Sequence, residues 1–351
     1  MSTTVSTGPG PAQPQAPDRP SQRRSARPAR RPVRKLSFRT RLRRDWQLLV
    51  MCIPMVVLLS LFHYLPMLGH TVAFQDYSPF RGDSPIEAYL ESPWLGFTNF
   101  ADLFADARFW TAFRNTLVIF TVQLIFFFPL PIFLAVLMNS ILSRRIRSTI
   151  QTIVYLPHFF SWVLVVAFFQ QMLGGAGLIA QIMHRLDTDG RWGIEPINVM
   201  TNPDTFIALV TSQVIWKDAG WGMIVFLAAL TQINPNLYEA AASDGAGPWR
   251  RFWHITLPGL RPVIVLLLIL RLGNALSVGF EQFILQRDFV GARAAEVLDT
   301  FVYFVVFGGG GSFSYGAAAG LFNGVVGLIL ILTANKIAHM LGQDGIYRKT
   351  A

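Results

Sequence analysis

Long apolar stretches, separated by segments that hold most of the charge, set the pattern of this chain. A helix needs ~20 predominantly apolar residues to cross the ~30 Å hydrocarbon core of a bilayer. Six stretches reach about this length: 47–69, 115–138, 150–173, 205–230, 262–283 and 312–341. We therefore predict an all-α integral membrane protein with six transmembrane helices.

The composition also indicates a membrane protein. Of the 351 residues, 52% are hydrophobic and 14% are charged, and the mean hydropathy is +0.41. A soluble domain of this length could hardly keep so little charged surface, so the composition disfavours a globular enzyme. The single cysteine, Cys52, lies inside the first apolar stretch, where we interpret it as an apolar filler. One cysteine cannot form an intramolecular disulfide.

The positive charge of the chain is concentrated at its N-terminus. Residues 1–46 contain 12 of the 30 Lys and Arg residues and only two acidic residues, so they account for the whole formal net charge of +10. This segment is rich in Pro, Ser, Ala and Arg without apolar periodicity, which is typical of a disordered tail. Beside a membrane span, attraction to anionic lipid explains such a tail more simply than nucleic-acid binding. The stretch 47–69 lacks a small-residue cleavage pattern, so we expect it to be retained as the first span.

Basic residues in short loops indicate which side of the membrane each segment occupies, because such loops stay in the cytoplasm. The 139–149 loop contains three arginines and no acid, and segments 231–261 and 342–351 are also basic. Acidic residues outnumber basic ones in the other three polar segments, 70–114, 174–204 and 284–311. We therefore predict that both termini and the 231–261 loop are cytoplasmic and that 70–114 is external.

The predicted cytoplasmic loop at 231–261 is the most informative segment. Asn234 can cap a helix that has Pro235 at its first position, and Gly245 can end this helix. A second short helix can follow and stop before Pro258. Its i, i+3, i+4 spacing places three aromatic residues on one face: Trp249, Phe252 and Trp253. A plain connection between spans needs neither the caps nor the aromatic face, so we predict two surface helices that offer a docking side.

Seven residues of this loop have a defined spacing: Glu239, Ala240, Ala241, Gly245, Ile255, Leu257 and Pro258. The pattern Glu-Ala-Ala, three residues, Gly, nine residues, Ile, one residue, Leu-Pro resembles the signature of permease subunits of type I binding-protein-dependent ABC importers. It matches that signature at every fixed position. The resemblance implies a coupling helix that docks in a groove of a cytoplasmic ATPase. There Glu239 would pair with a basic group, the alanines would allow close approach, and Gly245 would permit the bend.

The resemblance to these importers extends from about Arg44 to the C-terminus. Segments such as Tyr64–Gly69, Phe74–Phe80 and Tyr155–Trp162 are similar to the oligosaccharide, maltose-permease-like branch of the sugar importers. The family implies an ABC permease core at 115–341, a place in the bacterial cytoplasmic membrane, and import of a sugar or oligosaccharide by alternating access. The implied partners are a second permease subunit, a cytoplasmic ABC ATPase dimer and an extracytoplasmic sugar-binding protein. ATP hydrolysis would belong to the ATPase, and this chain would need no cofactor.

Five polar residues are predicted to lie on the fifth span: Arg271, Asn274, Ser277, Glu281 and Gln282. At 100° per residue they occupy one arc of about 140°, with Arg271 near mid-bilayer. An ionised arginine that faces lipid costs at least ~2.5 kcal/mol, so this arc should face a partner helix or a water-filled path. The spacing does not select between a translocation path for sugar and packing between helices, and both interpretations stay open.

Two other functions are compatible with six spans. The same architecture could import amino acids, polyamines or phosphate, or a single chain could act as an ion-coupled secondary transporter. The secondary transporter predicts paired ionisable residues deep in the membrane, whereas the fifth span carries only Arg271 at that depth. The histidines, acids and single cysteine form no catalytic or metal-ligand spacing, so we predict no catalytic residue and no metal site.

Overall fold

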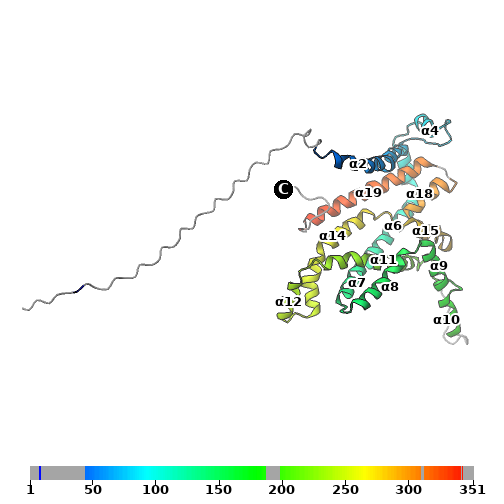
Figure 1. Ribbon diagram of the computed structural model, residues 1–351. Helices are drawn as coiled ribbons and strands as arrows, with labels where there is room; N and C mark the ends of the chain where they lie inside the picture. Colours follow the sequence, from blue (N-terminus) through cyan, green and yellow to red (C-terminus); the bar gives the residue numbers. More distant parts are fainter. Residues whose placement is uncertain (1–7, 9–43, 187–197, 310–311, 341, 343–351) are drawn as a thin grey trace, which may run out of the picture. The chain divides into compact units, whose positions relative to one another are not determined.

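The computed structural model describes residues 8, 44–186, 198–309, 312–340 and 342 (Figure 1). The chain forms two compact units, Met1–His63 and Tyr64–Ala351. Within the described ranges every regular element is a helix, and an isolated antiparallel bridge joins Gln75 and Trp94. The all-α prediction is confirmed. Most of the predicted tail at 1–46 and of the C-terminal segment at 342–351 lies outside the described residues.

Six helices in the described part of the chain are long and apolar enough to cross a membrane: Trp46–Phe74, Ala107–Ser140, Trp162–Leu186, Phe206–Leu230, Pro248–Gly273 and Phe313–Met340. The prediction of six transmembrane helices is confirmed. The second helix begins at Ala107 and not at 115, because the Asp106 carboxylate accepts a hydrogen bond from the Arg108 backbone N–H at 2.8 Å and caps it. The predicted external segment is shorter by the same residues.

The first span changes its helical type along its length. It starts as α2 (Trp46–Leu59) and continues as the π-helix η1 (Ser60–Tyr64), α3 (Leu65–Leu68) and the 3-10 helix η2 (Gly69–Phe74). Pro66 has no N–H to donate to Phe62, and the wider π turn lies directly before it.

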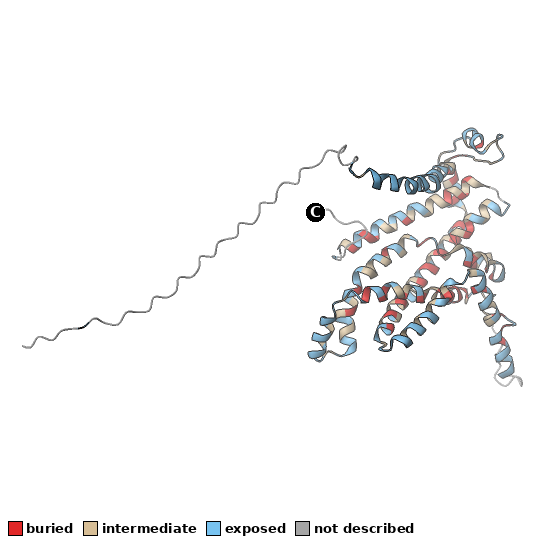
Figure 2. Ribbon diagram, viewed as in Figure 1, coloured by how far each residue is buried: buried red, intermediate tan, exposed pale blue. Residues whose placement is uncertain are grey.

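Helix α11 (Phe206–Leu230) is the most buried span and lies in the core of the second unit (Figure 2). Its neighbours include α6 (Ala107–Phe126), α7 (Pro129–Ser140), α8 (Arg144–Tyr155) and α14 (Leu257–Gly273). The contact with α8 is close at Gly220, where an added Cβ would lie 2.2 Å from the Val154 carbonyl oxygen. Any side chain at position 220 would push α8 away from α11.

Helices α14 and α19 (Phe313–Met340) also cross closely at glycines. An added Cβ on Gly273 would lie 2.5 Å from Cγ1 of Ile331, and one on Gly327 would lie 3.0 Å from the carbonyl oxygen of Gly273. Small residues thus let these two spans approach each other within the membrane.

The predicted third span, 150–173, is interrupted. Helix α8 ends at Tyr155 and is followed by the 3-10 helix η3 (Leu156–Phe159) and two non-helical residues. The third membrane-length segment starts only at Trp162 and comprises α9 (Trp162–Leu173) and α10 (Leu178–Leu186).

Two residues explain this interruption. Pro157 has no N–H and cannot donate to the helical ladder. Four residues later the Ser161 hydroxyl accepts a hydrogen bond from the Leu164 N–H at 3.4 Å and starts α9. Hydrophobicity alone did not reveal the break, because apolar residues continue through it.

The predicted fifth span, 262–283, is displaced towards the N-terminus. One continuous helix comprises α13 (Pro248–Arg251), the π-helix η4 (Phe252–Thr256) and α14. Asn274 leaves the helical conformation, with φ −101° and ψ 23°, and Gly279 has φ +117°. Both detailed predictions are therefore wrong: the second loop helix does not stop before Pro258, and the span does not continue to 283. Gly273 and Asn274 both have low helix propensity, which favours an end of the helix here.

Short helices connect the spans of the second unit. Between the first and second spans lie α4 (Pro85–Glu91) and α5 (Thr98–Ala105), and α12 (Pro235–Ser243) lies between the fourth and fifth. Between the fifth and sixth spans lie α15 (Phe280–Ile284), α16 (Arg287–Val290), α17 (Ala292–Ala295) and α18 (Leu298–Phe307). The Asn99 side-chain amide on α5 donates to the carbonyl oxygens of Ala73 (2.9 Å) and Gln75 (3.0 Å), and so holds α5 beside the end of η2.

Candidate functional site

The loop helices, defined as α12, α13 and η4, carry the motif of defined spacing. At the start of α12, Oδ1 of Asn234 accepts a hydrogen bond from the Asn236 N–H at 3.0 Å. At its end Gly245 has φ +73°, and the Ala246 N–H donates to the Ala241 carbonyl oxygen at 2.8 Å. Glycine adopts this left-handed conformation without a steric cost. The predicted caps of α12 are confirmed.

The second loop helix presents an aromatic face. The rings of Trp249, Phe252 and Trp253 pack together, with centroids 5.5–5.8 Å apart. Trp249 is nevertheless 72% exposed. Nε of Arg251 donates to the Ala246 carbonyl oxygen at 2.8 Å, which ties this helix to the end of α12. The predicted face exists, and the described residues leave much of its aromatic surface uncovered.

The seven motif residues divide by exposure. Four are exposed, Glu239, Ala240, Gly245 and Pro258, and three are half-buried, Ala241, Ile255 and Leu257. Between the two helices the Tyr238 hydroxyl lies 3.0 Å from Oγ1 of Thr256. On α12 and its C-terminal cap, the Glu239 carboxylate, Ala240 and Gly245 are therefore accessible. The half-buried motif residues help to pack the loop helices.

The polar residues of the predicted fifth span do not share one helix face. Arg271 lies in the last turn of α14, which ends at Gly273. Asn274 and Ser277 lie in the irregular segment that follows α14. Glu281 and Gln282 belong to α15. The prediction of a continuous arc is wrong, and the structure places these residues in different environments.

Arg271 binds a neighbouring helix. Its Nη2 donates to Oε1 of Gln123 on α6 at 2.9 Å, and its guanidinium carbon lies 5.6 Å from the centroid of the Phe127 ring. Nε of Arg271 and Nε2 of Gln123 are buried and have no hydrogen-bond partner among the described residues. Contacts of this kind support the interpretation as packing between helices.

Gln282 is part of a buried glutamine cluster. Its Nε2 donates to the Val210 carbonyl oxygen at 3.0 Å and to Oε1 of Gln213 at 2.8 Å, both on α11. Gln286 donates to the same oxygen of Gln213 at 3.0 Å. All three glutamines have no exposed surface, so Gln282 joins α15 to α11.

Asn274, Ser277 and Glu281 are exposed. The first two line a hollow of about 390 Å³ beside α14 and α19, together with Asn323. The Ser277 hydroxyl donates to Oδ1 of Asp299 at 3.3 Å. Burial raises the pKa of Asp299, and the hydrogen bond from Ser277 opposes this shift. Amide and hydroxyl groups on a concave surface can bind a hydroxyl-rich ligand, because each group donates or accepts hydrogen bonds.

Sequence analysis missed a cluster of ionisable residues near the middle of α11. Lys217 is buried, and its Nζ donates to the carbonyl oxygens of His158 (2.6 Å) and Phe160 (2.7 Å). The first carbonyl belongs to η3 and the second to the break before α9, where the helical ladder is interrupted. Lys217 therefore supplies hydrogen bonds that the broken backbone lacks, as the membrane interior requires.

Asp218 forms an accessible polar group with His158 next to this lysine. Nδ1 of His158 lies 2.8 Å from Oδ1 of Asp218, and the two side chains are 31% and 29% exposed. Trp221, which is 48% exposed, stacks on the imidazole with ring centroids 4.5 Å apart. Among the described residues no group of three His, Cys, Asp or Glu side chains could hold a metal ion. The sequence signal was the adjacent charges at 217 and 218, which are rare inside an apolar stretch.

Comparison with known proteins adds independent information. The family described as binding-protein-dependent transport system inner membrane component matches residues 127–341. The polygalacturonan/rhamnogalacturonan transport system permease protein YteP of Bacillus subtilis (strain 168) is 43% identical over 301 residues, which cover 86% of this chain and 90% of YteP. Protein LplB of the same organism is 41% identical over 313 residues, or 89% and 94% of the two chains.

Solved structures give the same result. One chain in the crystal structure of a bacterial alginate ABC transporter, in complex with an alginate pentasaccharide-bound periplasmic protein, superposes with a TM-score of 0.77. It is 35% identical to this chain, and the match covers 88% of this chain and 99% of that one.

Six apolar helices and the family match together define a multi-pass permease of the cytoplasmic membrane. More particularly, the chain belongs to the family of binding-protein-dependent transport system inner membrane components. The membership predicted from the spacing of the loop motif is thus confirmed, and the secondary-transporter alternative is disfavoured.

Replacing Lys217 by Met should destabilise the protein. Two carbonyl oxygens lose hydrogen bonds from a charged group, each worth roughly 1.5–3 kcal/mol. We expect a melting temperature lower by roughly 5 °C or more for the purified protein in detergent. The control is Lys336→Met on α19, where the lysine is exposed. Equal melting temperatures for the two variants would contradict the role assigned to Lys217.

Proposed function

We propose that this chain is one of two permease subunits of an ATP-driven importer that carries an oligosaccharide inward by alternating access. Membership of the inner membrane component family and an exposed loop motif support this proposal. The relative YteP is named for transport of polygalacturonan and rhamnogalacturonan, and the structural neighbour for transport of alginate. These names favour carbohydrate over amino acids, polyamines or phosphate.

The observation that carries the proposal is the exposed surface of the loop helices. Leu237 is 52% exposed and Trp249 72% exposed, next to the accessible carboxylate of Glu239. Apolar and aromatic groups with a charged neighbour are typical of a protein–protein interface. The partner proposed here is a cytoplasmic ABC ATPase dimer, which would hydrolyse the ATP. A second permease subunit and an extracytoplasmic sugar-binding protein complete the transporter.

Reversing the charge of Glu239 should weaken attachment of the ATPase. In the Glu239→Lys variant a lysine would face the basic group expected on the ATPase, and like charges at an interface repel. We expect at least a tenfold lower recovery of the ATPase in a pull-down, with unchanged insertion in the membrane. Glu91→Lys on α4 makes the same change at an exposed site outside the loop helices and should leave recovery unchanged. Full recovery with Glu239→Lys would refute the docking role.

The proposed orientation places both termini and the loop helices in the cytoplasm. In a Cys52→Ser background, single cysteines at Asn139 and Thr231 should be shielded from a membrane-impermeant maleimide in intact cells. A cysteine at Asp83 should react. All three positions are exposed in the folded chain, so a difference in labelling reports the side of the membrane. Permeabilised cells provide the control in which all three react, and the inverse pattern in intact cells would overturn the orientation.

We infer that the translocation path includes Asn274, Ser277 and Glu281, the exposed members of the predicted set. The accessible pair of His158 and Asp218 is a further candidate. Ionisable side chains that face lipid are costly, so exposed ones within a span are expected to face a water-filled path or a partner subunit. Arg271 and Gln282, by contrast, already bind neighbouring helices and are proposed to hold the path in shape.

Residues that line the path and residues that hold it in shape should respond differently to substitution. Asn274→Ala should lower uptake or alter the preference among oligosaccharides, with unchanged melting temperature and complex yield. Gln282→Ala should lower the melting temperature, because a buried partner on α11 loses a hydrogen bond worth roughly 0.6–2 kcal/mol. The measurement compares uptake, complex yield and melting on the same purified transporters. Parallel loss of all three in Asn274→Ala would contradict its place in the path.

A further inference from the structure

An open cavity outside the proposed path is lined by residues of α5, the start of α6, the α16–α18 region and the start of α19. Its volume is about 840 Å³, within the roughly 300–1,000 Å³ of small-molecule sites in proteins. In the proposed orientation this cavity lies at the external ends of the spans. None of the loop helices or predicted path residues belongs to its wall.

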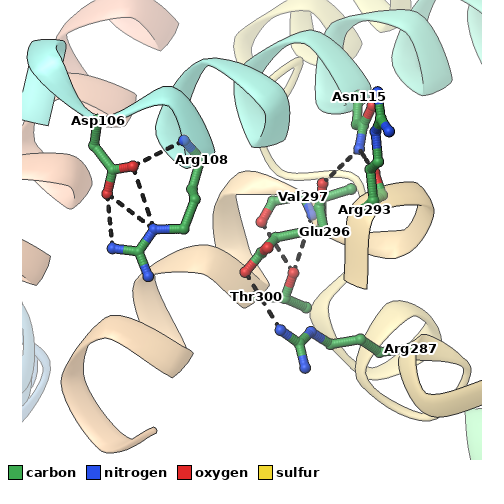
Figure 3. Close-up of polar contacts among 8 residues, drawn as sticks. All are labelled: Asp106, Arg108, Asn115, Arg287, Arg293, Glu296, Val297 and Thr300. Atoms are coloured by element: carbon green, nitrogen blue, oxygen red, sulfur yellow. Dashed lines mark hydrogen bonds and ion pairs between the residues drawn. The ribbon is translucent and has the colours of Figure 1, made fainter. Parts of the chain in front are cut away.

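One wall of the cavity is a fixed group of hydrogen-bonding side chains. The Asp106 carboxylate accepts hydrogen bonds from Nη2 of Arg108 at 2.8 Å and from the Tyr315 hydroxyl at 3.1 Å (Figure 3 shows the arginine pair). Burial opposes ionisation, yet the hydrogen bonds from Arg108 and Tyr315 hold the pKa of Asp106 below its usual value. The Arg108 side chain is still 72% exposed, so part of its guanidinium is available to a ligand.

The cavity wall also contains a second arginine, Arg287, whose position is fixed by neighbouring side chains but whose hydrogen-bonding capacity is not fully used. The guanidinium of Arg287 lies 3.9 Å from the centroid of the Phe304 ring, and its Nη2 lies 3.7 Å from Oε1 of Glu296 (Figure 3). Nε of Arg287 is buried and has no hydrogen-bond partner among the described residues. The Arg287 side chain is 22% exposed, so a ligand oxygen can reach the exposed part of this guanidinium.

The backbone around Glu296 is anchored independently of any ligand. The Asn115 side-chain amide on α6 donates to the carbonyl oxygens of Arg293 and Glu296, each at 3.0 Å (Figure 3). The Thr300 hydroxyl accepts a hydrogen bond from the Val297 N–H at 3.0 Å and caps α18. The charged wall is therefore preorganised, which reduces the entropic cost of binding.

The charges decide between ligand classes. Three carboxylates line the cavity, Asp102, Asp106 and Glu296, against two guanidinium groups. This balance disfavours a small free anion, and the arginines disfavour a free cation. Paired donors and acceptors suit hydroxyl groups, because each hydroxyl both donates and accepts. The aromatic rings of Phe301, Phe304 and Tyr315 add apolar surface for a sugar ring.

We propose that this cavity is an entry subsite that binds a sugar unit of the incoming oligosaccharide before that unit reaches the membrane-embedded path. The proposal rests on the proposed import of oligosaccharide. It assigns Arg108 and Arg287 as binding residues that donate hydrogen bonds to sugar oxygens, and Tyr315 and Phe304 as the apolar contact.

Transport by the complete reconstituted importer, with its ATPase and binding protein, tests the subsite. The probes are maltotriose, arabinotriose, trigalacturonate and alginate trisaccharide. Arg108→Gln and Arg287→Gln should each raise the KM for uptake of the transported probe by about tenfold, the loss for one hydrogen bond to a charged group. Arg293→Gln is the matched control, since this exposed arginine lies six positions after Arg287 and outside the cavity wall. Arg108 is largely exposed, so its variant remains informative even if Arg287→Gln fails to fold.

Protection from labelling tests binding directly. In a Cys52→Ser background, Ala105→Cys puts a thiol in the cavity wall, and Ala101→Cys puts one on the same helix outside it. The transported probe should slow maleimide labelling of the first variant at least threefold and leave the second unchanged.

The outcomes separate this inference from the proposed function. Normal uptake with an unchanged KM in both arginine variants, or no protection of the Ala105→Cys thiol, would overturn the subsite and leave the importer intact. Protection by the binding protein without sugar would assign the cavity to that protein instead and also overturn the subsite. Failure of the wild-type transporter to move any of the four probes would refute both proposals.

Discussion

Backbone polar groups within a bilayer must find partners inside the protein, and this requirement governs the second unit of the chain. Helix α11 supplies hydrogen-bond partners for the irregular backbone where η3 ends and α9 has not yet begun. The ammonium of Lys217 binds the carbonyl oxygens of His158 in η3 and Phe160 after it, and the glycine at position 220 lets α8 pack closely on α11. Helix α11 thus carries a lysine and a glycine within one turn. The two features together hold the interrupted segment against α11.

The same helix also organises the region after the fifth span. Gln213 on α11 accepts hydrogen bonds from two glutamines of the connecting segment, so that α15 is fixed although it is only five residues long. The irregular backbone between α14 and α15 leaves Asn274 and Ser277 exposed beside α19. A continuous helix would have turned these residues to different positions. The hollow therefore depends on the early end of α14, and α11 stabilises the segment that follows it.

The sequence predicted those features that depend on local physics. Membrane-spanning length follows from runs of apolar residues, and the caps of α12 follow from Asn234 and Gly245, so both agree with the structure. The arc on the fifth span failed because its periodicity was extended through a glycine and an asparagine that end the helix. The partners of Lys217 could not be inferred, since its contacts lie almost sixty positions away and involve backbone atoms that only the folded break exposes.

The absence of a break between the loop helices and the fifth span has a mechanical consequence. Residues Pro248–Gly273 form one rod of 26 residues, or about 39 Å at 1.5 Å per residue. If this rod pivots at its loop end, a tilt of about 10° moves Gly273 by roughly 7 Å. The other end of the rod packs against Gly327 and Ile331 of α19 and binds Gln123 of α6 through Arg271. The rod carries the Trp249 surface at one end and Gly273 at the other, so a small rotation at the loop end would displace Gly273 by several ångströms.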